Sequence, residues 1–154
     1  MSVCIIYHSE SGNTKEIAQK LSKITGADLI EVKPSKKYSK ISLYTLGIKR
    51  AISGDLDPIN HDKLDVSDYD TIVIGTPVWA GRQTPAINSA INALTGHKDK
   101  DAIVYATYKK DKAETFDILT TKLTENGMNV KSSFGFSESE INDNEKISGL
   151  AQLI

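Results

Sequence analysis

The chain has 154 residues, 39% of them hydrophobic and 25% charged, which are ordinary proportions for a soluble globular domain. Its 19 basic and 20 acidic side chains give a net charge of -1, which argues against bulk binding of nucleic acid. There is no apolar run of the roughly 20 residues that span a bilayer, and no signal-peptide pattern. The single cysteine, Cys4, excludes an intrachain disulfide and suits a reducing compartment. We therefore expect one domain, 1–154, in a cytoplasmic protein that enters no membrane.

Apolar strand patterns and amphipathic helical patterns alternate along the chain. The run 3–7 predicts a buried strand, 13–24 predicts a helix, and the half-polar run 28–32 is typical of an edge strand. Further strands are predicted at 71–75, 102–106 and 130–136, and further helices at 41–53, 84–95, 112–126 and 143–153. This alternation predicts an α/β doubly wound three-layer sandwich, with helices on both faces of a five-stranded parallel sheet.

Charge is distributed unevenly between the second and third predicted strands. Six basic residues and no acidic ones occur in 33–50, whereas 55–70 contains six Asp and a single lysine. One interpretation is a solvated connector around a helix. The other is a local docking surface, because charged patches can steer partners even when the net charge is near zero.

The predicted functional site lies where three loops meet. Open α/β sheets bind ligands beyond the carboxyl ends of their strands. The loops 8–14, 76–85 and 107–112 follow three of the predicted strands and should converge at that edge. Their convergence is stronger evidence for a site than any one loop alone.

The first loop is rich in hydroxyl and amide side chains and leads into a helix. A helix N-terminus carries a partial positive charge and free N–H groups, so this loop predicts a site for a phosphate monoester. The alternative is an ordinary helix cap formed by Ser11 or Asn13. Glu10 places a negative charge in this loop, which opposes phosphate binding, although its carboxylate can point to solvent while its amide still faces the ligand. The candidate binding residues are Ser9, Glu10, Ser11, Gly12, Asn13 and Thr14.

The second loop contains the only tryptophan of the chain, Trp79, between a proline and a glycine. A large aromatic side chain in such a loop either covers an apolar edge or contacts a planar ring of a ligand. Beside a phosphate site, the ligand contact is favoured. Thr84 is expected to cap the next helix, with Pro85 in its first turn. The candidate binding residues are Thr76, Pro77, Val78, Trp79, Ala80 and Gly81.

The third loop adds an aromatic residue and several lysines. Tyr108 could pack against the same planar ring, and the lysines could balance negative charge or simply be solvated. The candidate binding residues are Thr107, Tyr108 and Lys109. The three histidines of the chain are scattered and lack ligand spacing, so no metal site is predicted.

Two of these motifs resemble those of a known family. Ser-x-Ser-Gly-Asn-Thr at 9–14 resembles the phosphate-binding signature of flavodoxins, and Thr-Pro-x-Trp-x-Gly at 76–81 resembles the second flavin-contacting loop of flavodoxin-like proteins. The resemblance implies a short-chain flavodoxin with strand order 2-1-3-4-5. It also implies the cofactor FMN, with its 5′-phosphate in the first loop and its isoalloxazine ring between the second and third loops.

The resemblance implies an FMN-binding flavoprotein that acts in electron transport as a soluble one- or two-electron carrier for redox partner proteins. The alternative is an oxidoreductase that uses the flavin to reduce a quinone or another small acceptor with NAD(P)H. The compact size favours the carrier, and we assign no catalytic residue because no dedicated acid–base group is evident. A flavin-free interaction domain with this fold is a third possibility. We expect a monomer or weak dimer.

This sequence departs from typical flavodoxins in its charge. Typical members are strongly acidic and often have an acidic third loop, whereas this chain is nearly neutral and has Lys109, Lys110 and Lys112 there. Negative charge near a flavin disfavours its anionic reduced form. We therefore hypothesise that reduction to that form is easier here than in acidic relatives.

Overall fold

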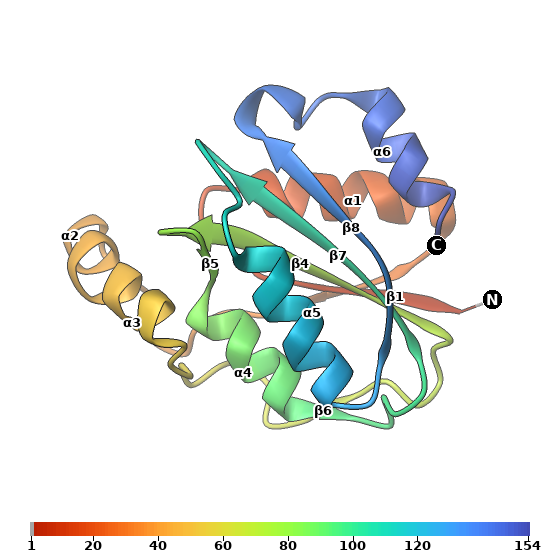
Figure 1. The fold of residues 1–154 in the computed structure, drawn as a ribbon, viewed down its shortest axis with the longest axis horizontal. Coiled ribbons are helices and arrows are strands. Elements are labelled where there is room, and N and C mark those ends of the chain that lie inside the picture. Colours follow the sequence, from red (N-terminus) through yellow and green to blue (C-terminus); the bar gives the residue numbers. More distant parts are fainter. Residues whose placement is uncertain (1) are drawn as a thin grey trace.

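The computed structural model describes residues 2–154, in which a central parallel sheet lies between two layers of helices (Figure 1). The main strands are β1 (Val3–Tyr7), β2 (Asp28–Glu31), β4 (Thr71–Trp79), β7 (Asp101–Tyr108) and β8 (Asn129–Ser137). They are parallel and lie in the order β2-β1-β4-β7-β8. Numbered among themselves along the chain, these strands have the predicted order 2-1-3-4-5, so the α/β fold prediction is confirmed.

Two pairs of helices cover the two faces of the sheet (Figure 1). Helices α1 (Asn13–Thr25) and α6 (Asn144–Ala151) pack on one face, and α4 (Pro85–Ala93) and α5 (Thr115–Glu125) pack on the other. Each helix is amphipathic and buries its apolar side against the sheet. The helices expected near these positions are therefore confirmed, with ends that differ by at most three residues from the predicted ones.

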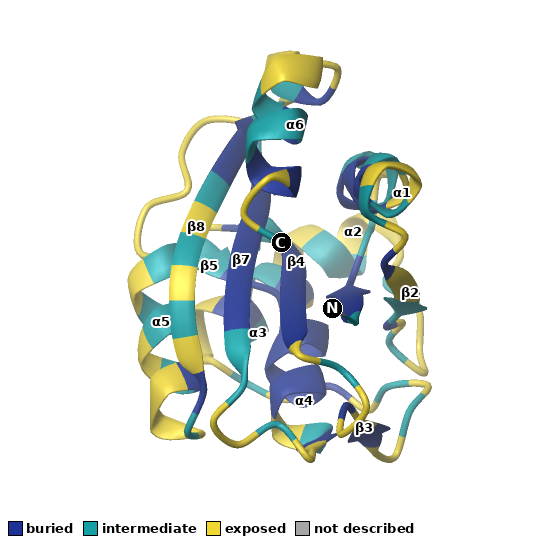
Figure 2. Cartoon of the chain, turned by 90° about the vertical axis from the view of Figure 1, so that its right-hand side faces the viewer, coloured by how far each residue is buried: buried dark blue, intermediate teal, exposed yellow. Residues whose placement is uncertain are grey.

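The strands show why the sheet needs helices on both sides. In β1, Cys4 and Ile6 join the core under α4 and α5, whereas Ile5 joins the core under α1 and α6. Successive side chains of a strand point to opposite faces, so a fully apolar strand must be covered twice. Figure 2 shows β4 and β7 buried along most of their length, while β2 at the edge is largely exposed.

The basic region after β2 forms a helical arm at the side of the domain (Figure 1). We define the helical arm as residues 40–53: α2 (Lys40–Ser42), the π-helical turn η1 (Leu43–Gly47) and α3 (Ile48–Ser53). A helix was predicted at 41–53, so its presence is confirmed, although the π-helical turn was not foreseen. Short strands β3 (Leu64–Asp65) and β6 (Leu94–Thr95) pair with each other at the end of α4 that is farther from the arm (Figure 1).

The strands reach further toward the site than the sequence suggested. The predicted loop at 76–85 is wrong in its first part, because β4 continues through Trp79 with Thr76 and Pro77 paired to β7. The chain then turns sharply into β5 (Arg82–Gln83), which pairs antiparallel with β4. Likewise, β7 continues through Tyr108 beside β8. Pro77 suggested a loop, but pairing with β7 keeps it extended, and the turn begins only at Ala80.

After β8, the short 3₁₀ turn η2 (Glu138–Glu140) leads to α6. Among residues 2–154, no helix combines the length and apolar character needed to cross a membrane.

Candidate functional site

A cleft of about 580 Å³ lies at the carboxyl ends of β1, β4 and β7, where the three predicted loops meet. Its volume is within the roughly 300–1,000 Å³ that is usual for small-molecule and cofactor sites. The predicted residues that line it are Glu10, Ser11, Asn13, Pro77, Val78, Trp79, Ala80, Gly81, Thr107, Tyr108 and Lys109. The structure therefore brings most of the predicted site together.

Four predicted residues do not line the cleft but organise its walls. Thr14 Oγ1 lies 2.7 Å from Thr107 Oγ1, which joins the first loop to the third. Ser9 Oγ accepts a hydrogen bond from the Lys15 N–H at 3.2 Å, and Thr76 Oγ1 accepts one from the Thr84 N–H at 3.3 Å. Gly12 is the fourth and sets the start of α1.

The first turn of α1 leaves backbone N–H groups available to a ligand. Its N-cap is Gly12, whose φ of 100° is in the left-handed region that favours glycine. Gly12 has no side chain with which to cap the helix, so the alternative of capping by Ser11 or Asn13 is wrong. Of the N–H groups in this turn, that of Lys15 is taken by Ser9 Oγ. Glu16 N–H bonds Gly12 O at 2.9 Å, whereas no acceptor for the N–H groups of Asn13 and Thr14 occurs among residues 2–154. This donor set fits an anion.

A buried tyrosine holds this turn of α1 against the sheet. Tyr105 is fully buried, and its hydroxyl donates a hydrogen bond to Thr14 O at 2.8 Å. The ring occupies the space above Gly75, where any Cβ would clash with it. Burial, with a smaller effect of Tyr7, raises the pKa of Tyr105 well above its usual value, so the phenol stays a donor. Gly75 is thus required by packing.

His8 links the first loop to the start of α4. Its Nδ1 lies 2.9 Å from Thr84 Oγ1, and its Nε2 lies 3.7 Å from a carboxylate oxygen of Glu10. Thr84 is the N-cap residue of α4 and Pro85 follows in the first turn, as predicted. The Thr84 side chain makes no capping bond, and its hydroxyl is instead paired with His8. Glu10 lines the cleft.

The second and third loops touch each other at backbone positions with positive φ. Ala80 and Gly81 have φ of 50° and 78° and form the two-residue turn between β4 and β5, as in a type I′ hairpin. Ala113 in the third loop has φ of 41°. A Cβ on Gly81 would lie 2.9 Å from the Ala113 Cβ, and Thr115 Oγ1 donates to Gly81 O at 3.0 Å. Strained residues of this kind cluster at functional sites.

Trp79 lines the cleft, but most of its ring is covered. It is 8% exposed and makes edge-to-face contacts with His8 and Tyr38, with ring centroids 5.8 and 5.6 Å apart. An ideal Cβ at Gly47 of the helical arm would lie 3.3 Å from the indole. Covering of an apolar edge is therefore part of the role of Trp79, and its contact with a ligand stays a prediction.

Tyr108 and the lysines form the third side of the cleft. The Tyr108 ring lies over Gly135 of β8, where an added Cβ would be 2.9 Å from its Cε1 atom. Lys109 and Lys110 follow at the end of β7, are exposed and line the cleft. Lys112 instead lies over the Phe116 ring, with Nζ 5.3 Å from its centroid.

The sequence prediction missed one wall of the cleft. Leu43, Tyr44 and Ile48 of the helical arm line it, and other lining residues that were not predicted are Lys110, Asp111, Ala113 and Glu138. The three arm residues are far in sequence from every predicted loop. The apolar residues within the predicted helix 41–53 were the only signal of this wall.

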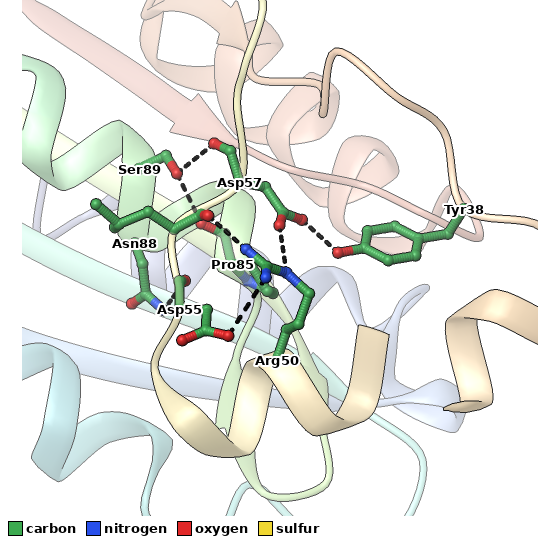
Figure 3. A network of polar contacts seen from close by, with 8 residues as sticks. Tyr38, Arg50, Asp55, Asp57, Pro85, Asn88 and Ser89 are labelled. Carbon is green, nitrogen blue, oxygen red and sulfur yellow. Dashed lines mark hydrogen bonds and ion pairs between the residues drawn. The ribbon is translucent and has the colours of Figure 1, made fainter. Parts of the chain in front are cut away.

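A polar network ties the helical arm to the body of the protein (Figure 3). Arg50 Nε donates to Asp57 Oδ1 at 2.8 Å and its Nη2 donates to Leu56 O at 2.6 Å. The Tyr38 hydroxyl donates to Asp57 Oδ2 at 2.5 Å, and burial together with Asp57 raises the pKa of Tyr38 to about 12. Ser89 Oγ of α4 donates to Asp57 O at 2.5 Å. The basic stretch 33–50 and the acidic stretch 55–70 are thus partly joined by ion pairs where they meet.

The sequence and fold were compared with known proteins. A flavodoxin family model matches residues 2–117. A comparison with curated protein sequences found no match. A flavoprotein from Lactobacillus acidophilus NCFM, solved in complex with FMN, is 25% identical with a TM-score of 0.70, over 92% of this chain and 97% of that one.

Two further structures have the same fold at lower sequence identity. A putative flavoprotein from Bacteroides uniformis is 20% identical with a TM-score of 0.83, over 98% of this chain and 97% of that one. The two-electron reduced flavodoxin of Megasphaera elsdenii is 17% identical with a TM-score of 0.65, over 97% and 96%. Together with the match of the family model over most of the sequence, these likenesses show that the chain belongs to the flavodoxin family.

Proposed function

We propose that the cleft binds FMN and that the protein carries one or two electrons between the flavin and redox partner proteins. The observation that carries this proposal is the position of the free N–H groups of the first turn of α1 at one end of a largely apolar cleft. In a phosphate monoester attached to a flat ring, the phosphate matches the N–H groups and the ring matches the apolar part of the cleft. Family membership and the FMN bound to the Lactobacillus acidophilus relative support the same cofactor.

The residues present fit each part of FMN. The dianionic phosphate would accept hydrogen bonds from the N–H groups of Asn13 and Thr14, where the helix dipole also favours negative charge. The ring would lie among Pro77, Val78 and Tyr108, which line the cleft beyond that end. When bound, the flavin supplies the redox chemistry. The chain's own residues bind and orient it and shield one side from water.

The size of the cleft supports an electron carrier over a reductase that binds a second substrate beside the flavin. Its volume of about 580 Å³ is that of a site for a single cofactor-sized ligand. The third loop also leaves Lys109 and Lys110 exposed at the rim, where a partner protein could reach them. A carrier needs only an accessible flavin edge and a surface on which a partner can dock.

Purification followed by cofactor analysis tests the proposal. We expect a yellow protein that releases FMN on denaturation, and an apoprotein that binds FMN more tightly than riboflavin, which lacks the phosphate. A colourless protein that FMN does not stabilise against heat would contradict FMN binding. Rapid turnover of NADPH and a quinone without an added reductase would contradict the carrier role and favour the oxidoreductase.

A further inference from the structure

The helical arm presents an apolar face to the cleft, and no predicted loop contributes to that face. Leu43, Tyr44 and Ile48 line the cleft beside Trp79 at the carboxyl end of β4. Other exposed apolar side chains of the arm, such as Ile41 and Leu46, do not line it. The arm therefore has one side that faces the site and another that faces solvent.

The π-helical turn explains how these residues share a side. The N–H of Ile48 donates to the carbonyl of Leu43, five residues earlier. In an ordinary α-helix, residues five apart lie about 140° apart around the axis. The i→i+5 pattern of a π-helix instead brings them to the same side. Tyr44 follows Leu43 directly and lies at the same wall.

Tyr44 and Trp79 differ sharply in the surface that they can offer to a ligand. Tyr44 is 66% exposed, whereas Trp79 is 8% exposed and is covered by His8, Tyr38 and the arm at Gly47. A planar ligand gains most by covering an aromatic face that water now contacts. On this wall of the cleft, Tyr44 has such a face and Trp79 does not.

The arm is held in place without a ligand. The Arg50–Asp57 ion pair at 2.8 Å joins α3 to the segment before β3, and the Tyr38–Asp57 hydrogen bond at 2.5 Å ties the residues just before the arm to the same carboxylate. Ser89 extends this network to α4 (Figure 3). Close packing of Gly47 on the Trp79 indole fixes its middle. Tyr44 is therefore presented on an anchored support, so little ordering is required when a ligand binds.

We propose that Tyr44 supplies the aromatic face on which the isoalloxazine ring of FMN packs, with Leu43 and Ile48 as apolar contacts beside it. The inference rests on the proposed FMN binding and assigns the ring contact to the helical arm. Trp79 then acts as a buried support that spaces the arm from β4.

The test compares three variants in apoprotein titrated with FMN and with lumiflavin, which has the ring but no phosphate. Tyr44→Ala should weaken the binding of both by about tenfold, the loss expected when a stacked ring is removed. It should also reduce the quenching of flavin fluorescence. Tyr44→Phe keeps the ring and should bind within about twofold of wild type. Ile41→Ala is the matched control, because Ile41 is 78% exposed on the same arm and does not line the cleft.

Thermal unfolding without flavin should be the same for all four proteins, since Tyr44 and Ile41 are both exposed. If wild type binds FMN and Tyr44→Ala binds and quenches both flavins equally well, the assignment of Tyr44 is overturned and FMN binding stands. If wild type binds no FMN, the proposed function fails and this inference fails with it.

Discussion

Ala80 occupies a backbone conformation that residues with a Cβ rarely adopt. Its φ of 50° belongs to the turn between β4 and β5, at the rim of the cleft. The left-handed region costs a residue such as alanine about 1 kcal/mol or more. The strain persists because the hairpin pairing of Trp79 with Arg82 and the contact of Gly81 with Ala113 fix the turn.

We predict that Ala80→Asn raises the free energy of unfolding by about 0.5–1 kcal/mol, because Asn-Gly is the sequence that type I′ turns favour. Urea denaturation of the two proteins measures the change. Ala90→Gly in α4 is the control and should destabilise by about 1 kcal/mol or more, as glycine does inside a helix. A loss of stability in Ala80→Asn would contradict the strain argument.

Glu140 is a carboxylate whose ionisation stabilises the fold. Its Oε2 lies 2.8 Å from Lys146 Nζ, and its Oε1 accepts a hydrogen bond from Ser137 N–H at 3.0 Å. These contacts lower the pKa of Glu140 from 4.5 to about 2. Because the folded-state pKa is lowered, the stabilisation is present above the unfolded-state pKa and is lost as the pH falls through about 2.

We predict that Glu140→Gln lowers the free energy of unfolding by about 1 kcal/mol at pH 7, a value discounted for the partial exposure of the pair. The difference from wild type should shrink between about pH 4.5 and pH 2. Urea denaturation over that pH range gives the measurement. The exposed Glu145→Gln serves as control. A difference that does not vary with pH would show that the ion pair is not its cause.

At the scale of elements, α1 has the same backbone feature at each of its ends. Gly12 at the N-cap and Gly26 at the C-cap have φ of 100° and 77°, and an added Cβ would meet nothing within 4 Å at either position. A substitution therefore strains the backbone at both ends without a steric clash at either. Only the N-terminal end of α1 lies at the cleft. Comparing a substitution of Gly12 with one of Gly26 therefore separates an effect on stability from an effect on ligand binding.

We predict that Gly12→Ala and Gly26→Ala each lower the free energy of unfolding of the apoprotein by about 1–2 kcal/mol. Gly12→Ala should also weaken FMN binding by about tenfold, because it shifts the N–H groups that would hold the phosphate. Gly26→Ala should bind FMN like wild type. Thermal unfolding and FMN titration measure the two effects. Equal FMN binding by both variants would argue against a phosphate site at this helix end.

At the scale of the whole molecule, the notable property is near-neutral charge with lysines at the rim of the site. The chain has a net charge of -1, and Lys109 and Lys110 line the cleft. Positive charge near a flavin favours its negatively charged reduced form through ordinary Coulomb attraction. Exposed charges are screened by salt, so the effect should weaken at high ionic strength.

We predict that Lys109→Glu and Lys110→Glu make the reduction potential of bound FMN more negative, by an amount equivalent to about 0.3–1 kcal/mol for each exposed charge. Potentiometry at low and high salt measures the shift. Lys23→Glu makes the same change in net charge at an exposed position near the far end of α1, and should leave the potential unchanged. Unchanged potentials in the Lys109 and Lys110 variants would remove the hypothesis.

The sequence carried most of the fold and much of the site because the signals were local. Apolar runs identified the five main strands, and helical spacing identified the helices between them. The first loop was correctly placed before the start of α1. The alternative of an N-cap at Ser11 or Asn13 is wrong, because the cap of α1 is Gly12. Glycine in the left-handed region ends the loop one residue before Asn13, and Ser9 supplies the side chain that accepts from Lys15 N–H.

Long-range packing decided what the sequence pattern could not. Trp79 was predicted from its position between proline and glycine, but its burial depends on Tyr38 and Gly47, which lie more than 30 residues earlier in the chain. Similarly, the apolar residues around Tyr44 indicate a packed helix but do not show which surface it borders. The turn from β1 into α1 depends on residues that are adjacent in the sequence, so the sequence alone determined its position. The wall formed by the helical arm exists only because the network around Asp57 and the contact of Gly47 with Trp79 bring distant segments together, so only the tertiary structure decided it.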